Sequence, residues 1–145
     1  MRVKDIMHRE VETLGLEDAL DVADDIMTLG RVRHLPVVAG ESHLVGLVTQ
    51  RDLLKASLAS VLELGRRAEH DWLKSIPVRL VMNTELETIA PNDPLKCAVD
   101  RMIAKKIGCL PVVEEGKLVG LLTETDCLQV LAAALADEPP PARTH

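Results

Sequence analysis

The chain has 145 residues, a formal net charge of −6 and 47% apolar residues, and Trp72 is its only Phe, Trp or Tyr residue. So acidic a chain with so few aromatic rings does not fit nucleic-acid binding, which relies on cationic side chains and base stacking. No apolar run is long enough to cross a bilayer, and the N-terminal MRVKDIMHREVE lacks the apolar stretch of a signal peptide. We therefore expect a cytoplasmic protein that makes no membrane contact.

The elements expected in the first half are an extended segment, a helix, a β-hairpin and a long helix. The extended segment carries Val11 and Thr13, and the apolar residues of the following helix recur at helical spacing: Leu20, Ala23, Ile26 and Met27. LPVV at 35–38 and LVGLVT at 44–49 flank a polar turn, which predicts a hairpin. A helix from about Arg51 to Glu69 carries another apolar stripe: Leu54, Leu58, Val61 and Leu62.

The same elements are expected again after the joining segment HDWLKSIP. An extended segment with Leu86 and Thr88 precedes a helix, for which Asn92 or Asp93 is the expected cap and Pro94 fits the first turn. The stripe of this helix is Leu95, Ala98, Val99, Met102 and Ile103. A hairpin from LPVV and LVGLLT and a last helix from about Thr125 to Ala136 follow, and the tail EPPPARTH is expected to be disordered.

This order reflects an internal duplication. Residues 3–38 align with 78–113 with 14 identities in 36 pairs, whereas chance would give roughly two. After one residue is dropped in the turn, 7 of the next 11 pairs match, so that GLVTQRDLL lies on GLLTETDCL. We expect a first repeat over 1–70, a linker over 71–77, a second repeat over 78–136 and a tail over 137–145. Because each repeat is small for a core of its own, we expect the two to pack sheet to sheet around one core, with approximate two-fold symmetry and two equivalent clefts.

The motif Gly-apolar-apolar-Thr-x-x-Asp occurs once in each repeat, at a predicted strand-to-helix junction. One interpretation is structural, with Thr49 or Thr123 capping the helix and the aspartate supporting its first turn. The other is ligand binding, because free N–H groups at a helix start attract an anion, while Asp52 or Asp126 can accept two hydrogen bonds from a vicinal diol. The two interpretations are compatible.

The repeats resemble the cystathionine-β-synthase (CBS) domain, and two in tandem resemble the CBS pair, or Bateman module. The resemblance rests on VxxxM at the start of each repeat, the Thr of ETL or ETI, LPVV, and the Gly-h-h-Thr-x-x-Asp motif, in which h is apolar. It implies a mixed α/β (α+β) fold, each repeat being a small sheet with two helices. It also implies binding of AMP, ADP, ATP or S-adenosylmethionine, with the Asp on the ribose and the Thr near the phosphate. These roles fall on six residues: Gly46, Thr49, Asp52, Gly120, Thr123 and Asp126.

Other candidate ligand contacts follow from the same resemblance. Arg33, His34 and Arg51 form a basic group suited to a phosphate, whereas Gly108, Cys109 and Thr125 stand at these positions in the second repeat and Glu124 replaces Gln50. We therefore expect the first site to favour a phosphorylated nucleotide. Thr13 and Thr88 are candidate adenine contacts, although strand propensity explains them equally well. The prolines of LPVV complete the set: Pro36 and Pro111.

No catalytic or metal-binding arrangement is evident. The five histidines and three cysteines have no zinc-ligand spacing, and Cys97, Cys109 and Cys127 are expected to be small buried residues. We expect no catalytic residues, no metal, no required cofactor and no enzymatic activity. The favoured hypothesis is a stand-alone regulatory module that binds an adenosine-containing ligand, forms a homodimer through exposed helix faces, and signals to an unidentified effector protein. The alternative is a ligand-free dimerisation or interaction module whose sites have decayed.

Overall fold

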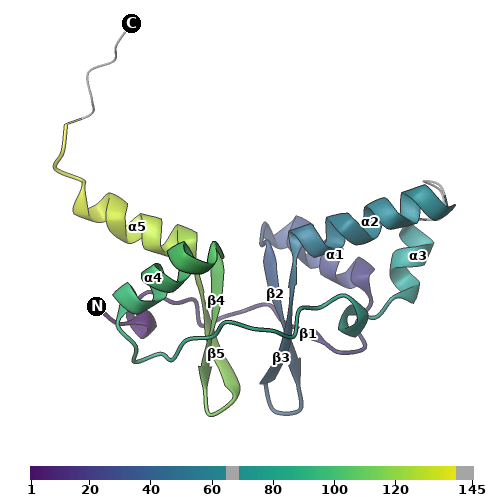
Figure 1. Cartoon of the computed structure of the whole chain (residues 1–145), viewed down its shortest axis with the longest axis horizontal. Helices are drawn as coiled ribbons and strands as arrows, with labels where there is room; N and C mark the ends of the chain where they lie inside the picture. The colour runs from purple at the N-terminus through teal and green to yellow at the C-terminus, as the bar shows by residue number, and fades with distance from the viewer. Residues whose placement is uncertain (65–68, 140–145) are drawn as a thin grey trace, which may run out of the picture.

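The computed structural model describes residues 1–64 and 69–139, and its two halves contain closely similar series of elements (Figure 1). The first half consists of η1 (Val3–Asp5), β1 (Leu14–Gly15), α1 (Leu20–Gly30), β2 (His34–Ala39), β3 (His43–Thr49), α2 (Gln50–Leu64) and α3 (Glu69–Ser75). The second consists of η3 (Val78–Leu80), α4 (Leu95–Lys105), β4 (Cys109–Glu114), β5 (Lys117–Thr123) and α5 (Glu124–Ala134). The mixed α+β fold class is as predicted.

The strands form one five-stranded sheet in the order β1-β2-β3-β5-β4. Both predicted hairpins are present, and each has the same register shift, after Val37 in one and after Val112 in the other. The hairpins join near their tips, where the Leu118 N–H donates to the Ser42 carbonyl over 2.9 Å. The helices of the first repeat lie beside β2 and β3, and those of the second beside β4 and β5 (Figure 1). The pairing of His43 with Lys117 near the hairpin tips joins β3 to β5 edge to edge.

Two separate hydrophobic clusters replace the single core that we expected. The first comprises Leu14, Leu20, Ala23, Met27, Leu35, Val37, Val48, Leu53, Leu73 and Val78. The second comprises Val3, Met7, Ile89, Ala98, Met102, Leu110, Val112 and Leu122. Each cluster is built from the helical stripe and the inward-facing strand residues of one repeat, so each repeat has most of a core of its own.

The starting segments of the two repeats are exchanged. Val3 and Met7 lie in the second cluster, whereas Val78 lies in the first. The exchange is symmetric in its hydrogen bonds, because the Val3 N–H donates to the Asp93 carbonyl at 3.0 Å and the Val78 N–H donates to the Asp18 carbonyl at 2.7 Å. Since each repeat completes the core of the other, the pair is the folding unit.

Several local predictions need correction. Helix α4 begins at Leu95 with Pro94 at its N-cap, and the Asp93 carboxylate accepts a hydrogen bond from the Ala90 N–H instead of capping the helix. Helix α3 covers much of the expected linker, and its Leu73 is buried in the first cluster. The side chains of Cys97 and Ile103 are exposed.

Parts of three predicted segments lie outside the described residues. They are residues 65–68 of the long helix, the side chain of Val61 in its stripe, and residues 140–145 of the tail. Within residues 1–64 and 69–139, no helix is both long and apolar enough to span a bilayer.

Candidate functional site

The exchanged segments bring each Thr-x-x-Asp motif against residues of the other repeat. His8 and Leu121 exchange two backbone hydrogen bonds, both 2.9 Å long, and Asn83 and Leu47 make the equivalent pair at 2.9 and 3.0 Å. The first motif therefore adjoins the segment that starts the second repeat, and the second motif adjoins the segment that starts the first. Both sites are composite.

The motif glycines allow the exchanged methionines to approach the strands. A Cβ atom added to Gly46 would lie 2.4 Å from the Met82 Sδ, and one added to Gly120 would lie 2.6 Å from the Met7 Sδ. Contacts this short exclude any side chain at these positions unless the methionine moves. The close approach predicted for these glycines is present, and the neighbouring groups belong to the other repeat: the Met82 side chain at Gly46, and the Met7 side chain with the His8 backbone oxygen at Gly120.

In both motifs the threonine and the aspartate hold each other at the helix start. The Asp52 Oδ2 accepts hydrogen bonds from the Thr49 N–H at 2.8 Å and the Thr49 hydroxyl at 2.9 Å. The Asp126 Oδ2 accepts the same bonds from Thr123 at 2.8 and 3.1 Å. The reciprocal bond from the Asp126 N–H to the Thr123 Oγ1 completes a capping box. The structural interpretation of the motif is therefore correct, and in each aspartate Oδ1 remains outside these bonds.

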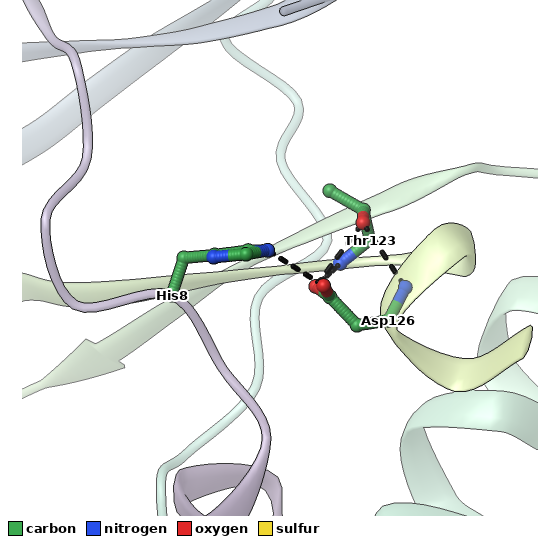
Figure 2. A network of polar contacts seen from close by, with 3 residues as sticks. All are labelled: His8, Thr123 and Asp126. Atoms are coloured by element: carbon green, nitrogen blue, oxygen red, sulfur yellow. Dashed lines mark hydrogen bonds and ion pairs between the residues drawn. The ribbon is translucent and has the colours of Figure 1, made fainter. Parts of the chain in front are cut away.

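The second oxygen distinguishes the two aspartates. The Asp126 Oδ1 lies 2.6 Å from the His8 Nε2. Figure 2 shows the imidazole facing this carboxylate from the side opposite the α5 helix start. Asp126 is only 5% exposed, whereas the His8 side chain is 63% exposed. Among the described residues, no side chain makes the equivalent contact with the Asp52 Oδ1, and Asp52 is half-buried. His8 was not among the predicted site residues.

A hollow of about 210 Å³ lies beside the second motif, between the two repeats. It is lined by both repeats: Arg9, Val11, Thr13, Val38, Ser42, Leu118, Val119 and Gly120. The exposed Thr13 thus lies with the motif glycine of the second repeat rather than with that of its own. Its counterpart Thr88 is half-buried, and the Thr88 carbonyl accepts a hydrogen bond from Arg101.

The predicted basic group lies close to an acidic residue of the other repeat. Arg33 and Arg51 are exposed, whereas His34 is half-buried beside Thr49. Burial lowers the pKa of His34, and Arg33 lowers it further, while the negative charge of Glu124 opposes both effects. Glu124 also covers Gly108, where an added Cβ would lie 3.2 Å from its carboxyl carbon. A phosphate near His34 would therefore be close to Glu124 as well as to Arg33.

A model of the family described as "CBS domain" matches residues 3–59 and 73–133. The chain belongs to the CBS domain family. A CBS domain-containing protein of Dictyostelium discoideum is 31% identical over 139 residues, which are 95% of this chain and 96% of that protein. Other curated relatives are much longer: the chain spans 24% of a homoserine O-acetyltransferase of Methanohalobium evestigatum, to which it is 31% identical over 130 residues.

Solved structures share the arrangement of a CBS pair. A Vibrio cholerae protein described as an acetoin utilization protein (AcuB) is 34% identical, with a TM-score of 0.79 over 97% of this chain and 98% of that one. The CBS pair of protein MJ0100, in complex with 5′-methylthioadenosine and S-adenosyl-L-methionine, has a TM-score of 0.76 at 21% identity and covers 92% and 98%. CBSX2 in complex with AMP has the same TM-score at 24% identity and covers 92% and 97%. The similarity to the MJ0100 pair and to CBSX2 shows that this chain has the same fold.

Two of the predicted site residues are buried in the interior of the protein. Pro36 and Pro111 are each less than 2% exposed, and they lie in β2 and β4 opposite Leu47 and Leu121. The Pro111 carbonyl accepts a hydrogen bond from the Ile89 N–H at 3.1 Å. Both prolines therefore present almost no surface to a ligand in this conformation.

The chemistry of the described residues offers no other candidate centre. Among residues 1–64 and 69–139, no three His, Cys, Asp or Glu side chains are grouped so that they could hold a metal ion. Burial, and secondarily Asp126, raises the pKa of Cys109 to about 12. The His8 contact was missed because an exposed histidine has no spacing that identifies its partner; the alignment of His8 with Asn83 was the available signal.

Proposed function

We propose that this CBS pair is a regulatory module that binds an adenosine-containing ligand at its two composite sites. The observation that supports this proposal is the geometry of Asp52 and Asp126. In each, Oδ2 is fixed by the threonine three residues earlier, and Oδ1 lies outside these bonds, where in Asp126 it faces the exposed His8 side chain. A carboxylate fixed in this way is preorganised to accept hydrogen bonds from the vicinal hydroxyls of a ribose.

The class of ligand follows from the solved relatives and from the helix starts. CBSX2 was crystallised with AMP, and the MJ0100 pair with two adenosine compounds that carry no phosphate. In this chain the N-termini of α2 and α5 would favour an anionic group near Thr49 and Thr123. AMP, ADP, ATP and S-adenosylmethionine are therefore the ligands to test, and we propose no catalytic role and a cytoplasmic location.

We further propose that phosphorylated ligands prefer the first site. Arg33 and Arg51 are exposed in the first repeat, whereas the second repeat has Gly108 and Thr125 there. An arginine can hold a phosphate with two parallel hydrogen bonds. Glu124 lies near both His34 and Gly108, so the proposed preference rests on the two arginines, and an adenosine compound without phosphate suits the second site better because that site lacks them.

Calorimetric titration with AMP, ADP, ATP, adenosine and S-adenosylmethionine tests the proposal. Asp52→Ala should lower the affinity of the first site for AMP at least about tenfold, because two charge-assisted hydrogen bonds to the ribose are lost. Asp52→Asn is the matched control for folding, because its amide oxygen can still accept the capping bonds from Thr49. If none of the five compounds binds or raises the melting temperature of the wild type, the proposed function is wrong.

Signalling requires a surface that responds to the ligand, and we propose that this surface forms a homodimer. Six leucines on α2, on α5 or at the C-cap of α5 are 43–85% exposed: Leu54, Leu58, Leu62, Leu128, Leu131 and Leu135. A groove of about 180 Å³ between α1 and α2 adjoins Leu54. So much exposed apolar surface on a chain of this size is typical of an interface. A ligand that alters the angle between the repeats would move the two helix faces and so alter contact with an effector protein.

A ligand-free dimerisation module is the second candidate function. It is favoured by the same exposed leucines, which need no ligand to form an interface. Light scattering of wild type and Leu58→Glu separates assembly from ligand binding: a monomer mass for the wild type would contradict the dimer. A dimer that binds no adenosine compound would support this second candidate.

A further inference from the structure

The two motif aspartates are equivalent in the fold but differ in their surroundings. His8 and Asn83 occupy matching positions and make matching backbone hydrogen bonds to Leu121 and Leu47. Nevertheless, only the His8 side chain contacts its motif aspartate among the described residues, with its Nε2 at 2.6 Å from the Asp126 Oδ1. The difference therefore comes from the side chain at this one position.

The burial of Asp126 explains why it needs this partner. A carboxylate that is 5% exposed loses most of its hydration, and each oxygen then requires a donor to offset that cost. Thr123 supplies two donors to Oδ2, and the imidazole lies against Oδ1 (Figure 2). Asp52 is more exposed, so water can reach its second oxygen.

We infer that His8 is an intramolecular competitor for the second site, because it holds the carboxylate oxygen that a ribose diol would need. This inference rests on the proposed function. A ligand at the second site must displace the imidazole before Asp126 can accept its hydroxyls, so His8 lowers the affinity of that site and makes it fill after the first.

Displacement involves the side chain and not the segment that carries it. The His8 backbone is fixed by its two hydrogen bonds to Leu121, and Met7 is held in the second cluster over Gly120. The imidazole itself is 63% exposed and can rotate into solvent. Displacement of the imidazole therefore costs one hydrogen bond, which lowers the affinity of the second site about three- to tenfold.

A reciprocal exchange of the two residues tests the inference. His8→Asn, in an Asp52→Ala background that reports the second site alone, should raise the affinity for adenosine about three- to tenfold. Asn83→His, in an Asp126→Ala background, should lower the affinity of the first site by a similar factor. His43→Asn is the control, because this exposed histidine lies at the hairpin tip opposite Lys117 and should change neither affinity.

A measurement without ligand tests the contact itself. The ring resonances of His8 in ¹H–¹³C spectra should move in Asp126→Asn and stay in place in Asp52→Asn. Unmoved resonances in Asp126→Asn would overturn the contact. Adenosine binding that is unchanged by His8→Asn would overturn the competition but leave the proposed function intact, whereas failure of every background and the wild type to bind would overturn both.

Discussion

In the first repeat the strand that follows α1 starts after Arg33 with His34, whereas the strand that follows α4 starts after Gly108 with Cys109. The backbone around these positions is the same in both repeats: the Gln50 N–H donates to the Arg33 carbonyl and the Glu124 N–H to the Gly108 carbonyl, both at 2.9 Å. The capping bonds of Thr49 and Thr123 also match. The comparison teaches that one backbone arrangement carries side chains of different charge at equivalent positions of the two repeats.

The largest effect that we predict is a difference in thiol reactivity between Cys109, at the buried start of β4, and the exposed Cys97. Cys109 takes the place of His34, and its burial raises its pKa to about 12, so its thiolate fraction near pH 8 should be about a thousandfold below that of an ordinary thiol. We expect iodoacetamide to modify the exposed Cys97 quickly and Cys109 only after unfolding. Mass spectrometry of peptides after timed labelling measures both rates. Equal rates for the two cysteines would show that Cys109 is not buried.

Alanine at the two motif glycines should destabilise the protein to different extents. Gly120→Ala and Gly46→Ala should each lower the free energy of unfolding by about 1–3 kcal/mol, because the new methyl group overlaps a packed methionine. Gly120→Ala should cost more, since its Cβ would also lie 2.9 Å from the backbone oxygen of His8, while at Gly46 the nearest atoms are all in the Met82 side chain.

The control for the glycine prediction is a double variant in which the overlapping methionine side chain is also removed. Gly46→Ala combined with Met82→Ala should cost less than the sum of the two single changes, because the second change removes the overlapping atoms. Urea denaturation of the four proteins gives the coupling. Strict additivity would mean that Gly46 is not required for the close approach of Met82.

Arg51 should distinguish phosphorylated from unphosphorylated ligands at the first site. Arg51→Ala should lower the affinity for AMP about three- to fivefold more than that for adenosine, a modest factor because the arginine is exposed and its pairing is screened. Lys55→Ala, one turn further along the exposed face of α2, should have no such effect. Equal losses for AMP and adenosine would mean that Arg51 supports the helix and does not contact the phosphate.

His34 should give the smallest effect, a pH dependence of stability. Burial places the pKa of His34 in the folded protein below its ordinary value of 6.5. Well above pH 6.5 the imidazole is neutral in both folded and unfolded chains. As the pH falls through 6.5 the unfolded chain takes up the proton first, so stability falls until the folded pKa is passed. Denaturation of wild type and His34→Gln from pH 7.5 to 5.5 should show the shallower fall in the variant. Parallel curves would contradict this.

The sequence was sufficient to predict the repeat, both hairpins and the junctions at which Thr49 and Thr123 cap α2 and α5. These features are local or are repeated in register, so spacing and turn residues determine them. The helix start at Leu95 was missed by about one residue because Asp93 satisfies a turn and not the helix end.

The exchange of the starting segments was beyond sequence reasoning. Val3 and Met7 were recognised as half of a repeated pattern, but no periodicity states which cluster an apolar residue joins when two similar ones are available. The same limit applies to His8 and Glu124, whose neighbours across the cleft depend on how the repeats are placed. The alignment of the repeats predicted the charge difference between the sites, and the structure adds that Glu124 acts on His34 of the first repeat.

The exchange also determines when each half of the protein can become stable during synthesis. The first cluster needs Leu73 and Val78, so the first repeat cannot close its interior when its own hairpin and helices have left the ribosome. The second cluster needs Val3 and Met7, which are synthesised about a hundred residues before the rest of that cluster is complete. All residues of the first cluster lie before residue 79, so that cluster can close while the second repeat is still being made, whereas the second cluster closes only after Leu122 of β5 has been synthesised.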